Sequence, residues 1–180
     1  LICLSVLVCY LFSIPAGLSQ QNDTPHCGKA VLTCFSGDRT GENPNSAAFV
    51  MYDVRDRSTV TPSLANQSGA FNKIDMNDFP NWIAFNTGEV FGVAIDRNEM
   101  IYLTATSIYT YDYRGNPVLG NTGGEVYQVN PTTGAINLLV RLPNSGQGLG
   151  NVCYAHAQNG QDLLFVTNFD DGKIYRIDLS

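Results

Sequence analysis

The stretch that decides the fold is Gly123–Leu142, which reads GGEVYQVNPTTGAINLLVRL. Its first half alternates, with Val126 and Gln128 on one face of an extended segment and Tyr127 and Val129 on the other. The Asn-Pro-Thr-Thr-Gly sequence that follows fixes φ at proline and tolerates a positive φ at glycine, which is typical of a turn. Apolar residues resume after the turn, so the stretch predicts a β-hairpin.

The first strand of this hairpin has two counterparts in the chain. A tyrosine, any residue, a β-branched residue and a polar residue occur in that order at 52–55, 127–130 and 175–178. An apolar run that carries a threonine precedes each copy, at Thr33, at Thr104 and at Thr167. These patterns predict the third and second strands of a repeated antiparallel unit.

The outer strands of the unit can be placed from the same repeat. Residues 91–100 and 149–162 predict first strands, because each has a short β-rich run followed by a polar turn. Residues 58–65 and 135–142 predict fourth strands. The chain is therefore expected to contain three strands of one unit, four of the next and three of another.

Repeated antiparallel sheets bury both of their faces when they stack around an axis, which is the arrangement of a β-propeller. The sequence predicts an all-β fold, as a β-propeller fragment of about three four-stranded antiparallel blades. We expect blade remnants at about 27–66, 82–142 and 143–180 within a partial propeller that spans 20–180. Propellers have four or more blades, so we expect a chain that is truncated at both ends. A complete β-sandwich of about ten strands is the alternative. Trp82 is expected to anchor the connection between two units.

The runs GEVFGVAIDRNEMIYLTATSIYTYD, GGEVYQVNPTTG, LPNSGQGLGNVCY and LFVTNFDDGKIYRID resemble NHL-type and gluconolactonase-like six-bladed propellers. They are most similar to the N-terminal propeller region of large exported bacterial cell-surface proteins of the adhesin type. The resemblance covers about residues 27 to 180 and implies a binding or architectural role. It also implies an alternative function, a metal-dependent hydrolase, because gluconolactonase-like propellers hold a divalent metal in their central channel.

Carried onto this sequence, the resemblance makes Glu89 and Asn151 the candidates to face a channel ligand, since both stand at the start of first strands. A Ca²⁺ ion needs six or more oxygen ligands. Two candidates do not supply them, so we expect no resident cofactor and keep calcium as a possibility. The competing interpretation makes Glu89 a solvated loop acid and Asn151 a turn residue.

The N-terminus predicts export. Residues 1–14 are almost entirely apolar, and Pro15 and small residues follow, so 1–19 is interpreted as a signal peptide that lacks its basic start. A membrane anchor is the alternative, but the apolar run is shorter than the roughly 20 residues that span a bilayer. We expect a secreted or cell-surface protein with no transmembrane helix in its mature chain.

Three cysteines remain after such a cleavage. Cys27 and Cys34 could close a short disulfide loop in an exported protein, and Cys153, in an apolar strand pattern, is expected to be a buried thiol. None of these cysteines has the spacing of a zinc site.

Tyr109, Tyr111 and Tyr113 share one face of an extended segment. Such a row could contact a sugar or a protein partner, or it could form a cross-strand aromatic ladder.

The net charge of −6 comes from ten basic and sixteen acidic residues, and the basic ones are scattered. Nucleic-acid binding is therefore not expected, because no cluster could replace phosphate counterions. No Ser–His–Asp arrangement can be assembled from the sequence. The leading hypothesis is a non-catalytic interaction or architectural module that binds protein or carbohydrate at the cell surface.

Overall fold

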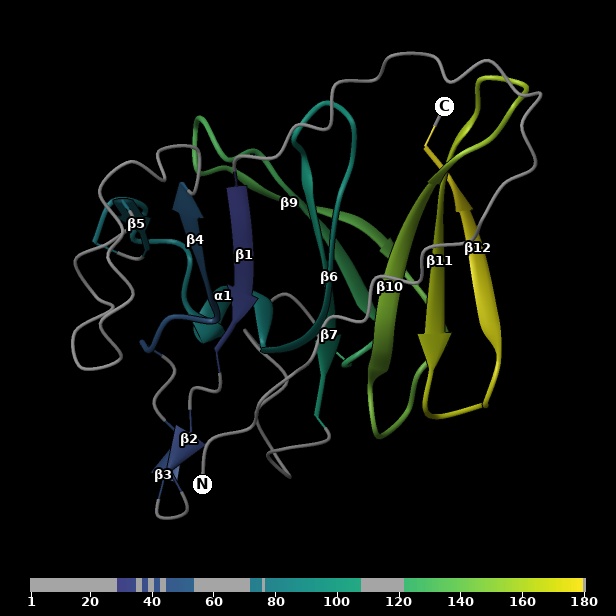
Figure 1. Ribbon diagram of the computed structural model, residues 1–180. Coiled ribbons are helices and arrows are strands. Elements are labelled where there is room, and N and C mark those ends of the chain that lie inside the picture. The colour runs from purple at the N-terminus through teal and green to yellow at the C-terminus, as the bar shows by residue number, and fades with distance from the viewer. Residues whose placement is uncertain are drawn as a thin grey trace, which may run out of the picture.

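A computed structural model describes residues 29–34, 37–38, 41–42, 45–53, 72–75, 77–107 and 122–179 of the chain. These residues form twelve strands and one short helix (Figure 1). The first sheet has the order β1 (Lys29–Thr33), β4 (Phe49–Asp53), β5 (Asn72–Ile74). The second sheet has the order β6 (Glu89–Ile95), β7 (Ile101–Thr106), β8 (Glu125–Val129), β9 (Ile136–Arg141). The third has the order β10 (Leu149–His156), β11 (Asp162–Asn168), β12 (Ile174–Asp178).

Two small elements complete the described fold, namely a hairpin of β2 (Gly37–Asp38) and β3 (Gly41–Glu42) and the helix α1 (Ala84–Thr87). All strand pairs are antiparallel. The structure confirms the predicted all-β class, and its three main sheets have three, four and three strands. Within the described ranges, no helix is long and apolar enough to cross a membrane.

The three sheets follow one another in chain order, and a hydrophobic core lies in each of the two spaces between them (Figure 1). The central strand β7 is buried along its whole length and supplies both cores. Ile101, Leu103 and Ala105 pack in the first core, between the first and second sheets. Tyr102 packs in the second core, on the opposite face of the strand. Because side chains alternate between the two faces of a strand, this one strand contributes side chains to both cores.

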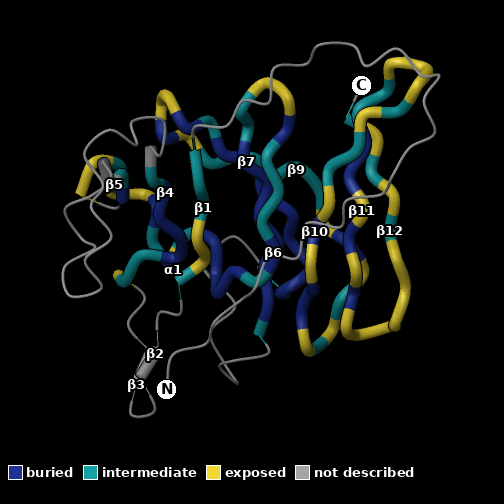
Figure 2. Tube along the Cα trace, viewed as in Figure 1, coloured by how far each residue is buried: buried dark blue, intermediate teal, exposed yellow. Residues whose placement is uncertain are grey.

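Burial falls toward the third sheet. In β11 the buried residues Leu164 and Val166 alternate with the exposed residues Phe165 and Thr167 (Figure 2). In β12 every second residue is exposed. One face of this sheet thus closes the second core, and the other is open to solvent among the described residues.

Trp82 joins the first two sheets, as the sequence predicts. Its side chain is fully buried, and its ring centroid lies 4.5 Å from that of Phe49 and 4.8 Å from that of Phe79. The indole Nε1 donates a hydrogen bond of 3.0 Å to the carbonyl of Gly134, in the turn between β8 and β9. The backbone carbonyl of Trp82 accepts a second bond from Ala48 of the first sheet, at 3.1 Å.

The strand register of the first unit differs from that of the other two units. Thr104 and Thr167 pair with the residue just before Tyr127 and Tyr175, namely Val126 and Ile174. Thr33 instead pairs with Phe49, three residues before Tyr52. The register of this strand pair therefore differs by two residues from that of the other two pairs. A shift by two residues leaves every side chain on the same face of the sheet, so the alternation of apolar and polar residues does not reveal it.

The fourth strand of the first unit was expected at 58–65, a segment that lies outside the described residues. In the first sheet β4 pairs with β1 on one side and with β5 on the other, and Ile74 of β5 packs against the first core.

Candidate functional site

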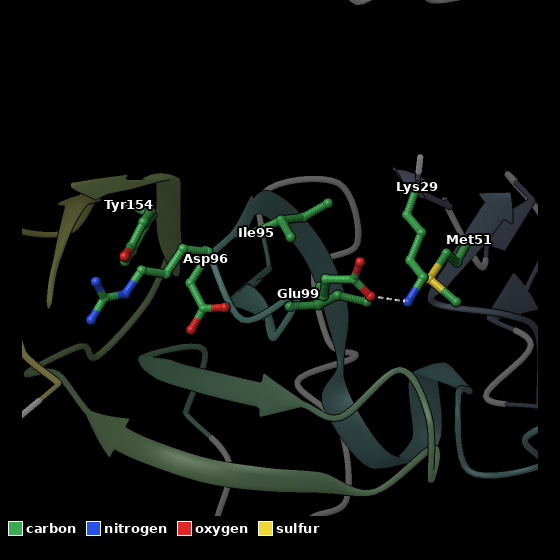
Figure 3. A pocket seen from close by; sticks show the side chains of 8 residues that line it. Lys29, Met51, Ile95, Asp96, Glu99 and Tyr154 are labelled. Carbon is green, nitrogen blue, oxygen red and sulfur yellow. Dashed lines mark hydrogen bonds and ion pairs between the residues drawn. The ribbon is translucent and has the colours of Figure 1, made fainter. Parts of the chain in front are cut away.

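A pocket of about 290 Å³ lies where the three sheets meet, next to the turn between β6 and β7 (Figure 3). Its lining residues come from all three sheets: Lys29, Met51, Ile95, Asp96, Arg97, Glu99, Ile101 and Tyr154. The apolar members pack against or belong to the first core, so the floor of the pocket is fixed by the hydrophobic packing of the fold. The charged members come from the turn and from β1.

Glu99 occupies an unusual position in this turn. Its φ of 64° is left-handed, and it is the only residue other than glycine with a positive φ in the described part of the chain. The turn between β10 and β11 has the same backbone bonds, with the carbonyls of Asp96 and Ala157 accepting from Glu99 and Gly160 respectively. Gly160, with φ of 87°, thus takes the equivalent position in the third sheet.

A left-handed residue other than glycine costs roughly 1 kcal/mol or more. The carboxylate of Glu99 forms an ion pair with Lys29 of the first sheet across the pocket (Figure 3). The third sheet makes the same turn with glycine, so hairpin geometry does not require the strained residue. The backbone strain places a charged group on the rim of the pocket, which is typical of functional sites.

Asp96 holds the turn in shape. Its Oδ1 accepts hydrogen bonds from the backbone amides of Asn98, at 2.8 Å, and Met100, at 2.9 Å. Its Oδ2 accepts a bond of 3.0 Å from the hydroxyl of Tyr102, which in turn accepts one from the amide of Gln128. Asp96 thus caps the turn through its side chain. Burial, with the nearby charge of Asp96, raises the pKa of Tyr102 to about 12, so this hydroxyl remains a donor at neutral pH.

A second polar cluster, which joins the second and third sheets, adjoins the pocket. The carboxylate of Asp162 accepts a hydrogen bond of 2.6 Å from the hydroxyl of Tyr154 and lies 2.7 Å from Nδ1 of His156. Its other oxygen lies 3.3 Å from a guanidinium nitrogen of Arg97, which belongs to the second sheet. We name Arg97, Tyr154, His156 and Asp162 the Arg97–Asp162 cluster.

The cluster shifts the ionisation of its members. The hydrogen bonds from Tyr154 and His156, together with the charge of Arg97, lower the pKa of Asp162 below the usual range of an aspartate. Burial, followed by the bond to Asp162, raises the pKa of Tyr154 to about 12. At neutral pH the carboxylate is therefore charged and the phenol neutral. A carboxylate held by these hydrogen bonds is a poor general base.

The two channel candidates lie away from this pocket. Glu89 begins β6, whereas the pocket begins at the other end of that strand, at Ile95, roughly 20 Å away at the rise of an extended chain. Glu89 is buried, 1% exposed, so the interpretation as a solvated loop acid is wrong. Asn151 is exposed in β10, and its side-chain oxygen accepts a hydrogen bond of 3.0 Å from the amide of Val152. In the described ranges, no group of three or more His, Cys, Asp or Glu residues is placed to hold a metal ion.

The predicted tyrosine row and the predicted disulfide concern residues that are mostly outside the described part of the chain. Tyr109, Tyr111, Tyr113 and Cys27 lie outside the described residues. Cys34 follows β1 and is half-buried, and its amide donates to the carbonyl of Ala48.

The prediction for the last cysteine is wrong, because Cys153 is exposed in β10. Its neighbours Val152 and Tyr154 face the second core instead. A bulge between Leu149 and Val152 sets which residues of this strand face inward, and an apolar run cannot reveal its position.

The sequence analysis did not single out Lys29, Arg97, Glu99 or the partners of Asp162. One local signal was available. Tyr154 and His156 share a face of their strand, and the next strand begins with Asp162 directly opposite His156. A hairpin with Tyr-x-His on one arm and Asp at the start of the other predicts a polar cluster, whereas the contribution of Arg97 requires the packing of two sheets.

The chain matches no protein-family model, no curated protein and no solved structure.

Proposed function

We propose that the three sheets are consecutive blades of a β-propeller and that the chain is a non-catalytic interaction and architectural module of an exported protein. The succession of sheets supports this proposal. Each sheet covers the next in chain order, and the middle one is covered on both faces. The alternative β-sandwich has two layers, and its sheets would each keep one face in solvent.

The observation that carries the interaction role is the pocket where the three sheets meet. Its floor is apolar, its rim holds the ion pair of Lys29 with Glu99, and Arg97 and Tyr154 of the Arg97–Asp162 cluster complete its lining. A concave apolar site with a few fixed polar groups is the usual form of a binding site. The partner that we propose is a protein or carbohydrate of a cell surface, with an apolar or aromatic group that enters the pocket.

A binding experiment with a matched control tests the role. The purified chain is applied to a glycan array and to a panel of extracellular-matrix proteins, and the affinity for each positive ligand is measured by surface plasmon resonance. The variant Lys29→Met removes one rim charge of the pocket. The control Lys173→Met removes a lysine from the turn between β11 and β12, where it pairs with Asp171.

We expect at least one ligand in these panels, with an affinity that falls tenfold or more in Lys29→Met and stays unchanged in Lys173→Met. Equal affinities of the two variants for every ligand found, or no ligand at all, would contradict the proposed role of the pocket.

The burial of Glu89 favours one second candidate, the metal-dependent hydrolase, because a buried acid at the start of a first strand has the position of a channel ligand in gluconolactonase-like propellers. Calcium separates the two functions. A rise in melting temperature with Ca²⁺ that disappears in Glu89→Gln would favour the hydrolase, whereas the interaction module needs no such rise.

A further inference from the structure

The outward face of the third sheet exposes apolar side chains beside Arg176, which lies opposite Phe165. Phe165 and Ile174 are 37% and 69% exposed, whereas the residues that alternate with them are buried in β11 and half-buried in β12. Cys153 is also exposed and lies directly opposite Phe165 in the ladder between β10 and β11. We name Cys153, Phe165, Thr167 and Ile174 the outer face.

The corresponding face of the second sheet shows how such a surface is covered. The hydroxyl of Thr104 accepts a hydrogen bond of 2.8 Å from the amide of Gly92 and donates one of 2.6 Å to the carbonyl of Gly150, in the third sheet. Thr104 thus joins its own sheet to the next one along the chain. A Cβ atom at Gly92 would lie only 2.7 Å from the amide nitrogen of Val152, so the two sheets approach closely here.

Thr167 has the same place in the third sheet. Each threonine lies in a second strand, opposite a bulge in the first strand: β6 is irregular between Val90 and Val93, and β10 between Leu149 and Val152. The hydroxyl of Thr167 is exposed, and its bond to the carbonyl of Asn151, in its own sheet, is long at 3.4 Å. The third sheet therefore has the same threonine as the second sheet, in the same place, but in the described part of the chain no further sheet packs against it.

From this repetition we infer that a further antiparallel sheet of the same polypeptide, following the third sheet in chain order, packs on the outer face and accepts a hydrogen bond from Thr167. The inference rests on the proposed function, since it treats the sheets as blades. The occupant follows from continuity with the two existing interfaces, in which the first sheet is covered by the second and the second by the third. Gly150 stands against the hydroxyl of Thr167 as Gly92 stands against that of Thr104, since a Cβ atom would lie 2.3 Å and 2.6 Å from the respective Oγ1.

The thiol of Cys153 reports on the outer face directly. The protein purified from its source and the 180-residue chain are each treated with a maleimide, and the modification of the Cys153 peptide is followed by mass spectrometry. We expect modification at least tenfold slower in the protein from the source. Equal rates would overturn the inference, as would protection in the 180-residue chain that is lost on dilution, because that result makes the occupant a second copy.

Substitution of the two threonines gives a matched control. Thr104→Val should lower the melting temperature of both proteins by roughly 5 °C, because it leaves two buried backbone groups unpaired. Thr167→Val should lower it only in the protein from the source, and no effect there would also overturn the inference. Binding at the pocket is measured separately, so its loss with Cys153 still protected would contradict the proposed interaction role alone.

Discussion

At the scale of single residues, Glu99 combines a left-handed backbone conformation with a charged side chain at the pocket. The equivalent turn of the third sheet has Gly160 at the same left-handed position, so the backbone geometry belongs to the hairpin and the side chain to the pocket. The ion pair with Lys29 returns about 0–1 kcal/mol, which does not clearly exceed the cost of the strained backbone.

The cost of the left-handed backbone predicts an order of stability among variants of Glu99. Both Glu99→Gly and Glu99→Ala remove the ion pair, but only glycine relieves the strain at a φ of 64°. Glu99→Gly should therefore be more stable than Glu99→Ala by about 1 kcal/mol in urea unfolding. A finding that the alanine variant is as stable as the glycine variant would show that this turn does not hold the left-handed conformation.

At the scale of elements, the same type of turn occurs at two places in the chain. In Asn130–Ala135 and in Asn168–Lys173, the amide of a glycine donates to the carbonyl of the asparagine, at 2.8 Å and 3.0 Å. The asparagine side chain accepts a further bond of 2.9 Å from the amide two residues on. The sequence predicts both turns, because asparagine and glycine carry the necessary bonding and backbone freedom at fixed positions.

The two turns have different surroundings, so a glycine-to-alanine substitution should lower the free energy of unfolding by different amounts in each. Gly134 and Gly172 have φ of 72° and 69°, but a Cβ atom would lie 2.1 Å from the ring of Phe79 at Gly134 and would meet nothing within 4 Å at Gly172. Gly172→Ala should cost about 1 kcal/mol of unfolding free energy, from backbone strain alone. Gly134→Ala should cost about 2–4 kcal/mol, because overpacking adds to the strain. Equal losses in urea unfolding would show that the ring of Phe79 does not pack tightly against Gly134.

The elements also show where prediction from the sequence stops. Alternation and turn residues are local, and they predict β7, β8, β11 and β12. The bulge in β10, the position of β5 and the two-residue offset at Tyr52 depend on which strand lies alongside, and a shift by two residues leaves a local pattern unchanged. The pocket was missed for the same reason, because its lining residues come from three sheets that meet only in the folded molecule.

At the scale of the whole molecule, the Arg97–Asp162 cluster ties the second sheet to the third and makes this contact sensitive to acid. The pKa of Asp162 is lowered in the fold, so its contribution to stability is present above the ordinary aspartate pKa of about 4 and is lost as the pH falls through the lower, folded value. The urea midpoint of the unmodified chain should therefore exceed that of Asp162→Asn at pH 7, and the difference should shrink at pH 3. A difference that does not change with pH would contradict this role of the charged carboxylate.

The sheets are covered unevenly, so the third sheet is less buried than the second. Strand β7 is enclosed on both sides, whereas every second residue of β12 faces water. Opening of the molecule should therefore start at the third sheet and reach the centre last, since local unfolding begins where the fewest apolar contacts must be broken. Amide protons of β7 would then exchange only through global unfolding, whereas those of β12 would be lost through local fraying that leaves the first two layers intact.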